Sequence, residues 1–182
     1  MKNTALIIID IQNDYFDGGA LTLEGAEHAA ANTSNLLDLF RTKQCPIIHI
    51  QHETLKPEMG FMLPDTYGQE IHSSVTPQSE ETCITKHYPN AFWETSLEKE
   101  LKTQNITHLV IAGMMTHMCV SSTIRAAMER GFQVTAIQDA CATRSLAIND
   151  TEIPANVVHQ TALAELTLIA NICSLDEFTK NL

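Results

Sequence analysis

Hydrophobic residues in this chain are concentrated in short continuous runs, and segments with helical periodicity separate the runs. In the first run, residues 5–9 are all apolar and Asp10 follows directly. Runs of this kind are typical of parallel strands that are buried on both faces. We therefore predict strands at residues 4–10, 46–51, 82–86, 108–112, 132–138 and 167–172.

The segments between these runs favour helices. In residues 25–43 the apolar positions recur at helical spacing and would form one buried face. Strands that alternate with helices predict an α/β fold, here a doubly wound, mostly parallel six-stranded sheet flanked by helices, in a single Rossmann-like domain over residues 1–182. Further helices are predicted at 96–103, 119–130 and 154–166, with a terminal turn at 175–179 and a long loop at 53–79.

The composition narrows the classes of function. The 182 residues include 22 acidic and 11 basic side chains, which gives a net charge of −11 at pH 7. This excess argues against nucleic acid or an anionic membrane as the main partner, but it says little about a small-molecule substrate. No targeting or transmembrane pattern is found. The five cysteines are widely spaced and form no zinc pattern, so a reducing cytoplasm and no metal or other cofactor are expected.

Polar side chains stand at or after the ends of three predicted strands. Asp10 ends the first strand, Lys86 ends the third, and Cys119 follows the fourth. Because ligands of open parallel sheets bind beyond the carboxyl ends of the strands, we expect these three side chains to meet at one edge. The carboxylate could take the thiol proton, and the ammonium charge would favour both anions. This is the arrangement of an activated nucleophile.

Cys119 also opens the predicted helix at residues 119–130. A helix N-terminus favours negative charge, so the sequence predicts a thiol that ionises easily. The thiolate is the reactive form of cysteine. The alternative is a buried structural cysteine.

Two stretches contain short motifs around Asp10 and Lys86. Residues 10–15, DIQNDY, are similar to a DxQxDF pattern in which Tyr15 takes the place of Phe. Lys86 precedes residues 90–92, NAF, which are similar to a K…SAF pattern with Asn90 in the place of Ser.

Two further motifs complete the set. Residues 113–120, GMMTHMCV, match a GxxTxxCV pattern around Cys119, and residues 139–143 are DACAT. In this order and spacing, the four motifs resemble those of the isochorismatase-like cysteine hydrolases. The resemblance extends from residue 4 to about residue 173.

The resemblance implies a role for each of these residues. Cys119 would be the nucleophile, Asp10 the general base and Lys86 their electrostatic partner. The backbone N–H groups of Met115 and Cys119 would form an oxyanion hole, with a cis peptide bond between Met114 and Met115. The implied reaction cleaves a C–N bond in a small amide, ureide or lactam through an acyl-enzyme.

Other functions remain open. Isochorismatases proper cleave a vinyl ether and need no thiol, so Cys119 argues against that activity. Nicotinamidases in this superfamily bind a metal through an Asp-x-His pair, whereas this chain has residues 49–53, HIQHE. His49 and His52 point to opposite faces of a strand, although His52 with His72 could still bind a metal. A non-catalytic protein and a redox-responsive thiol protein are the remaining alternatives.

Several residues are candidates for a substrate pocket. His52 follows a predicted strand, and Phe61, Tyr67 and Trp93 could form an apolar wall. His117 lies in the nucleophile turn and would either contact substrate or point to solvent. Gln12 and Asp14 are expected to hold the turn after the first strand.

Apolar residues outside the predicted core indicate a homodimer or larger homo-oligomer, since exposed apolar patches commonly mark interfaces. Relatives implied by the resemblance also commonly assemble. The alternative is that these side chains fold back over the monomer as a lid. The residues concerned are Phe61, Met62, Leu63, Leu175 and Phe178.

Overall fold

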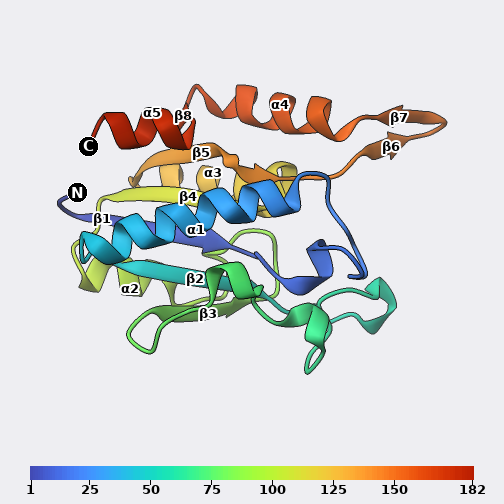
Figure 1. The fold of residues 1–182 in the computed structure, drawn as a ribbon, viewed down its shortest axis with the longest axis horizontal. Coiled ribbons are helices and arrows are strands. Elements are labelled where there is room, and N and C mark those ends of the chain that lie inside the picture. The colour runs from blue at the N-terminus through green and yellow to red at the C-terminus, as the bar shows by residue number, and fades with distance from the viewer.

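The computed structural model describes residues 1–182 and has the predicted α/β architecture (Figure 1). One six-stranded sheet has the order β3-β2-β1-β4-β5-β8, and all neighbouring strands are parallel. The strand order reverses between β1 and β4, which is where doubly wound sheets bind ligands. The strands are β1 (Thr4–Ile9), β2 (Ile47–His52), β3 (Thr82–Lys86), β4 (His108–Met114), β5 (Gln133–Ala142) and β8 (Asn171–Cys173).

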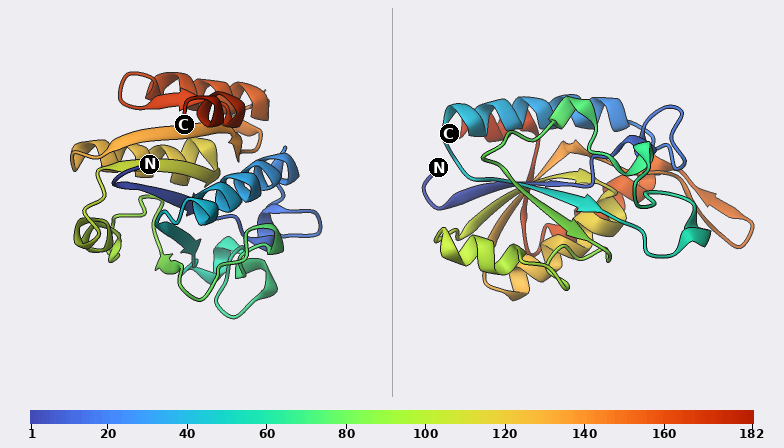
Figure 2. Two further views of the ribbon diagram at one scale, coloured as in Figure 1. Left: turned by 60° about the vertical axis from the view of Figure 1, so that its left-hand side comes forward. Right: turned by 90° about the horizontal axis from the view of Figure 1, so that it is seen from below.

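Helices cover both faces of the sheet (Figure 2). Alternate residues of β1 point to opposite faces, so Ile7 joins the core beneath α2 (Leu97–Thr103) and α3 (Ser121–Glu129), whereas Ile8 joins the core beneath α1 (Ala26–Thr42). The continuous apolar run in the sequence is explained by this burial on both faces. The helices are α1 (Ala26–Thr42), α2 (Leu97–Thr103), α3 (Ser121–Glu129), α4 (Ala155–Leu166) and α5 (Leu175–Lys180). None of them is long and apolar enough to span a membrane.

The predicted elements differ from the structure in several places. The helix expected to begin at Cys119 begins at Ser121, because residues 116–120 form a π-helical turn, η5. The strand expected at 167–172 is only Asn171–Cys173, since residues 167–170 turn back on the end of α4 and leave Leu168 91% exposed. The sequence also did not predict the hairpin of β6 (Leu146–Ile148) and β7 (Thr151–Ile153), whose strands are too short to give an apolar pattern.

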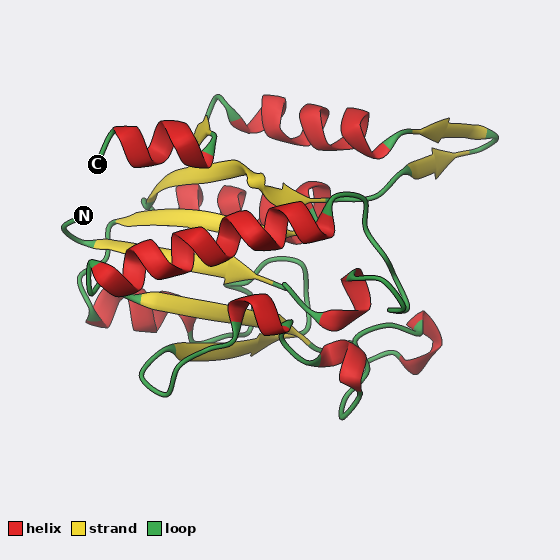
Figure 3. Cartoon of the chain, in the orientation of Figure 1, coloured by secondary structure: helices red, strands yellow, loops and turns green.

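The segment between β2 and β3 is mainly loop, as predicted, with the short helical turns η2 (Pro57–Met59), η3 (Tyr67–Gln69) and η4 (Ser73–Val75) (Figure 3). Gln12 holds one end of this loop, because its side chain accepts from the His52 N–H at 2.7 Å and donates to the His52 carbonyl at 2.8 Å. The Asp14 carboxylate accepts from the backbone N–H groups of Ala20 and Met62. Both side chains therefore organise the turn after β1.

Four of the five apolar residues that suggested an interface pack against the monomer. Met62 is fully buried, and Phe61, Leu175 and Phe178 pack against the core on the α1 side of the sheet. These side chains are therefore used at least in part within the monomer, and they do not decide between the interface and the lid. The oligomeric state itself stays a prediction.

Candidate active site

The structure brings together the three polar residues at the strand ends. Lys86 Nζ lies 2.7 Å from Asp10 Oδ2 and donates to Cys119 Sγ at 3.3 Å. The side chains of Asp10 and Lys86 are fully buried, and Cys119 is 5% exposed. A carboxylate, an ammonium and a thiol thus form one buried cluster at the carboxyl edge of the sheet.

The sheet creates this arrangement at its reversal point. Asp10 follows β1 with φ +50°, in the left-handed region, and Cys119 follows the adjacent β4. Gly113 in β4 has φ +134°, and a Cβ there would lie 2.0 Å from the Ile9 carbonyl oxygen. Only glycine therefore lets β4 approach β1 closely enough at this point.

The electrostatics of the cluster favour a protonated lysine and a neutral thiol. Burial opposes the charge on Lys86, but the Asp10 carboxylate and Cys119 sulfur raise its pKa overall. Burial and the Asp10 carboxylate raise the pKa of Cys119, and the opposing effect of Lys86 is smaller. The expectation that a helix N-terminus makes this thiol ionise easily is wrong, because the residue lies in the buried η5 turn before α3.

His52 is a fourth member of the cluster. Its Nδ1 lies 3.0 Å from Lys86 Nζ, and burial together with the Lys86 charge lowers the pKa of His52 to about 4. The ring stacks against Phe61 with centroids 6.3 Å apart. His52 is therefore a neutral acceptor for the buried ammonium group.

The η5 turn that presents Cys119 is anchored to the end of β5. Thr116 Oγ1 donates to the Ala142 carbonyl at 3.1 Å, and His117 hydrogen-bonds to Thr143. The peptide bond between Met114 and Met115 is cis, as the family resemblance implies. The backbone N–H of Met115 donates no hydrogen bond within the protein. This group is thus available to a ligand beside Cys119.

A cavity of about 540 Å³ opens onto Cys119. Its wall is mainly apolar and includes Phe61 and Met115, while His52 contributes a polar edge. Sequence reasoning missed Tyr15 and Arg144, which also line it. Tyr15 could have been noticed because it departs from the Phe of the DxQxDF pattern, and Arg144 because it directly follows the DACAT segment.

Three of the proposed pocket residues lie outside this cavity. Trp93 is 54% exposed and Tyr67 is 76% exposed, and neither lines the wall. His117 points instead to Thr143. Tertiary packing decided these positions, because the loops that contain Trp93 and Tyr67 turn the rings toward solvent.

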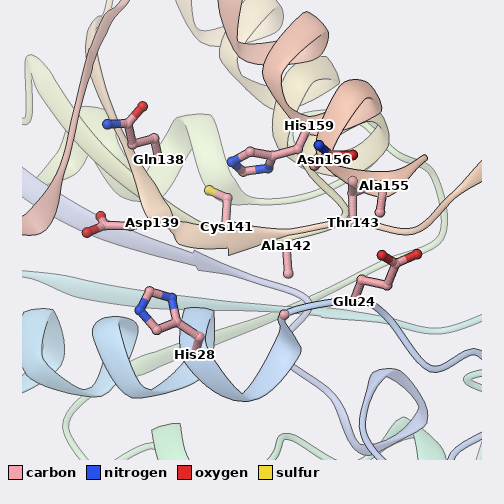
Figure 4. Close-up of a pocket in the computed structure, with 11 residues that line it drawn as sticks. Glu24, His28, Gln138, Asp139, Cys141, Ala142, Thr143, Ala155, Asn156 and His159 are labelled. Carbon is pink, nitrogen blue, oxygen red and sulfur yellow. The ribbon is translucent and has the colours of Figure 1, made fainter. Parts of the chain in front are cut away.

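A second, smaller cavity of about 260 Å³ lies near the end of β5 and does not include the cluster (Figure 4). Cys141 lines it, and burial raises the pKa of that thiol to about 12. The other polar groups around it, which include His28, Asp139 and His159, come from separate elements (Figure 4).

The histidines near the site do not form a metal-binding set. His52 Nδ1 is already engaged by Lys86, and His72 stacks on Phe16 at 3.7 Å and hydrogen-bonds Ser74. No group of three or more His, Cys, Asp or Glu side chains is arranged to hold an ion. The residues present therefore do not fit the metal of nicotinamidases.

Comparisons with known proteins show which sequences and folds this chain resembles. The chain is 43% identical to YddQ of Bacillus subtilis, an uncharacterised isochorismatase family protein, over 97% of this chain and 99% of that one. It is 23% identical to the ureidoacrylate amidohydrolase RutB of Variovorax paradoxus, over 76% of this chain and 68% of that one. The crystal structure of an isochorismatase from Pseudomonas putida superposes with a TM-score of 0.90 at 36% identity, covering 96% of this chain and 89% of that one. The family model for the isochorismatase domain matches residues 4–177, so the chain belongs to the isochorismatase family of hydrolases.

Proposed function

We propose that this protein hydrolyses the C–N bond of a small amide, ureide or lactam through a covalent Cys119 intermediate. The observation that supports this most strongly is the position of Lys86, whose Nζ contacts both Asp10 and Cys119 in a buried cluster at the cavity. A thiol with a raised pKa needs a base beside it to become a nucleophile, and Asp10 is that base.

The first half of the reaction forms the acyl-enzyme. The Cys119 thiol gives its proton to Asp10 as Sγ forms a bond to the substrate carbonyl carbon. The Lys86 charge stabilises the sulfur anion while the proton moves. The carbonyl oxygen becomes an oxyanion, which the N–H groups of Met115 and Cys119 stabilise. The intermediate then collapses, the C–N bond breaks, and Asp10 returns the proton to the leaving nitrogen.

The second half releases the acid. Asp10, now ionised again, takes a proton from water as the water oxygen attacks the thioester carbon. The C–S bond breaks, the product leaves as a carboxylic acid, and the sulfur recovers the proton from Asp10. Lys86 keeps its proton throughout, since its pKa is raised.

One of the relatives supports amides as the substrate class. RutB is named for an amidohydrolase activity. Vinyl-ether hydrolysis would give no role to the contact between Lys86 and Cys119. A dithiol redox couple would need a second thiol beside Cys119, and Cys141 lines the other cavity.

Ammonia release from a panel of small amides tests the proposal. The wild-type protein should release ammonia, and Cys119→Ala should release none above the background. Cys141→Ala is the matched control, because it removes a buried thiol outside the cluster. Pyruvate release from a vinyl-ether substrate, with no ammonia from any amide, would contradict the assignment. Activity lost on dialysis against EDTA and restored by zinc would favour the nicotinamidase alternative.

A further inference from the structure

The formal charges on the wall of the Cys119 cavity are all positive. Lys56 and Arg144 line the cavity, and no Asp or Glu does. The chain as a whole has the opposite balance, with a net charge of −11. Neither Lys56 nor Arg144 forms an ion pair with a carboxylate of the protein. Both side chains are exposed, and Arg144 donates only from Nε to the Ser145 carbonyl, so both charges are available to an anion at the cavity.

The two cations come from separate segments that border the same space. Arg144 follows the end of β5, to which the η5 turn is anchored through Thr116 and Ala142. Its charge is felt within that turn, where it adds to burial in lowering the pKa of His117. Lys56 comes from the loop between β2 and β3. An anion held by both would lie within the cavity that also exposes Cys119.

Closer to the cluster, two hydrogen-bond donors lack protein partners. His52 Nδ1 accepts from Lys86, so the ring proton is on Nε2, which has no hydrogen-bond partner in the protein. Tyr15 is 2% exposed and lines the cavity, yet its hydroxyl makes no hydrogen bond. Burial, with the nearby Cys119 and Asp10, raises the pKa of Tyr15 and keeps the phenol protonated. The wall near the cluster thus offers donors to substrate oxygen atoms.

Most of the remaining wall is apolar, with Leu21, Leu55, Met59 and Phe61 among its residues. An anion placed against these side chains alone would lose hydration without compensation. A carboxylate that reaches Arg144 and Lys56 would regain that energy through charge-assisted hydrogen bonds. The apolar wall would hold the short carbon chain between the carboxylate and the amide.

We propose that the substrate is a small amide that also bears a carboxylate, which Arg144 and Lys56 bind while the amide carbonyl lies at Cys119. This inference rests on the proposed amide hydrolysis and specifies its substrate class. Arg144 and Lys56 then determine specificity and take no part in bond cleavage.

Three amides with chains of similar length test the charge preference. Succinamate ends in a carboxylate, butyramide in a methyl group and 4-aminobutanamide in an ammonium. We expect kcat/KM to be at least about tenfold higher for succinamate than for butyramide, and to be lowest for the positively charged 4-aminobutanamide. Arg144→Gln should reduce the preference for succinamate over butyramide by about tenfold, mainly through KM. Arg125→Gln is the matched control, because that arginine is on the surface of α3 and pairs with Glu165; it should leave the preference unchanged.

Calorimetry separates this inference from the proposed reaction. Cys119→Ala removes the nucleophile, so succinamate can be titrated into it without turnover. Tighter binding of succinamate than of butyramide, weakened by Arg144→Gln, supports the carboxylate site whether or not any amide is hydrolysed. Equal affinity for the two, no detectable binding of succinamate, or a preference for 4-aminobutanamide would overturn it. Ammonia release from butyramide with no preference for succinamate would leave amide hydrolysis standing and reject the carboxylate.

Discussion

Lys86 Nζ lies 3.0 Å from His52 Nδ1, and this contact fixes the protonation of the histidine. An ammonium group can only donate, so Nδ1 must be unprotonated and the ring proton must be on Nε2. The pKa of His52 falls to about 4 through burial and the Lys86 charge, so the neutral ring persists at neutral pH. His52 thus orients the ammonium group without adding a second positive charge to the cluster.

The first prediction separates this hydrogen bond from packing at residue 52. His52→Phe removes the acceptor and should lower kcat/KM by roughly 10- to 100-fold, since a hydrogen bond to a charged group contributes about 1.5–3 kcal/mol. His52→Asn keeps an oxygen that can accept from Lys86 and should recover most of the activity. Steady-state kinetics on both variants decides this. Equal losses of kcat/KM in His52→Phe and His52→Asn would mean that the His52 ring acts only by filling space.

The same contact predicts a pH dependence of stability. The pKa of His52 in the folded protein, about 4, is below its reference value of 6.5, so the unfolded state binds the proton more tightly. The contribution of His52 is complete above about pH 6.5 and is lost as the pH falls toward 4. Urea unfolding at pH 7 and pH 4.5 should show that His52→Asn loses less stability than wild type, by on the order of 2 kcal/mol. An identical loss in the two proteins would refute this linkage.

Asp10 and Lys86 should each be needed for turnover. Asp10→Asn removes the base, and Lys86→Met removes the charge while keeping an unbranched side chain. Each should lower kcat by at least about 10²-fold, the usual scale for acid–base groups. Both side chains are fully buried, so the folding of each variant is measured alongside its activity.

A double variant of Asp10 and Lys86 separates the contribution of this pair to stability from its contribution to catalysis. Lys86→Met alone leaves the buried Asp10 carboxylate without its partner, which costs roughly 3–5 kcal/mol. Asp10→Asn combined with Lys86→Met should regain much of this stability and remain inactive. Chemical denaturation and ammonia release measure the two effects on the same samples. Recovered activity in the double variant would contradict the assigned roles.

The sequence predicted the sheet and the meeting of Asp10, Lys86 and Cys119 because continuous apolar runs and their ends determine both. The sequence could not predict that His52 is neutral, since its protonation depends on the position of the ammonium group of Lys86, which is 34 residues later in the chain. The environment of Cys119 was missed for a similar reason. Its burial arises from η5 packing onto β5 through Thr116, a contact between residues far apart in the chain.

Alkylation of the thiols tests how Lys86 acts on Cys119. Lys86 favours the thiolate, so Lys86→Met should slow the reaction of Cys119 with iodoacetamide. Cys83 is exposed on β3 and serves as a reference thiol within the same molecule. Peptide mass mapping after brief labelling should show a lower ratio of Cys119 to Cys83 modification in the variant. An unchanged or higher ratio would rule out this electrostatic role.

The β6–β7 hairpin predicts that the protein forms a homodimer or larger assembly. It projects away from the body of the molecule, and Ile148 at its turn is 63% exposed (Figure 1). A two-stranded hairpin is marginally stable in water by itself, so we expect a second copy of the chain to pack against it. Light scattering coupled to size exclusion should give a mass of at least twice 20.2 kDa. Ile148→Lys should shift the protein toward the monomer, whereas Leu168→Lys, at an even more exposed site outside the hairpin, is the control. A wild-type monomer with full activity would exclude the assembly, and dissociation by Leu168→Lys alone would place the interface at the end of α4.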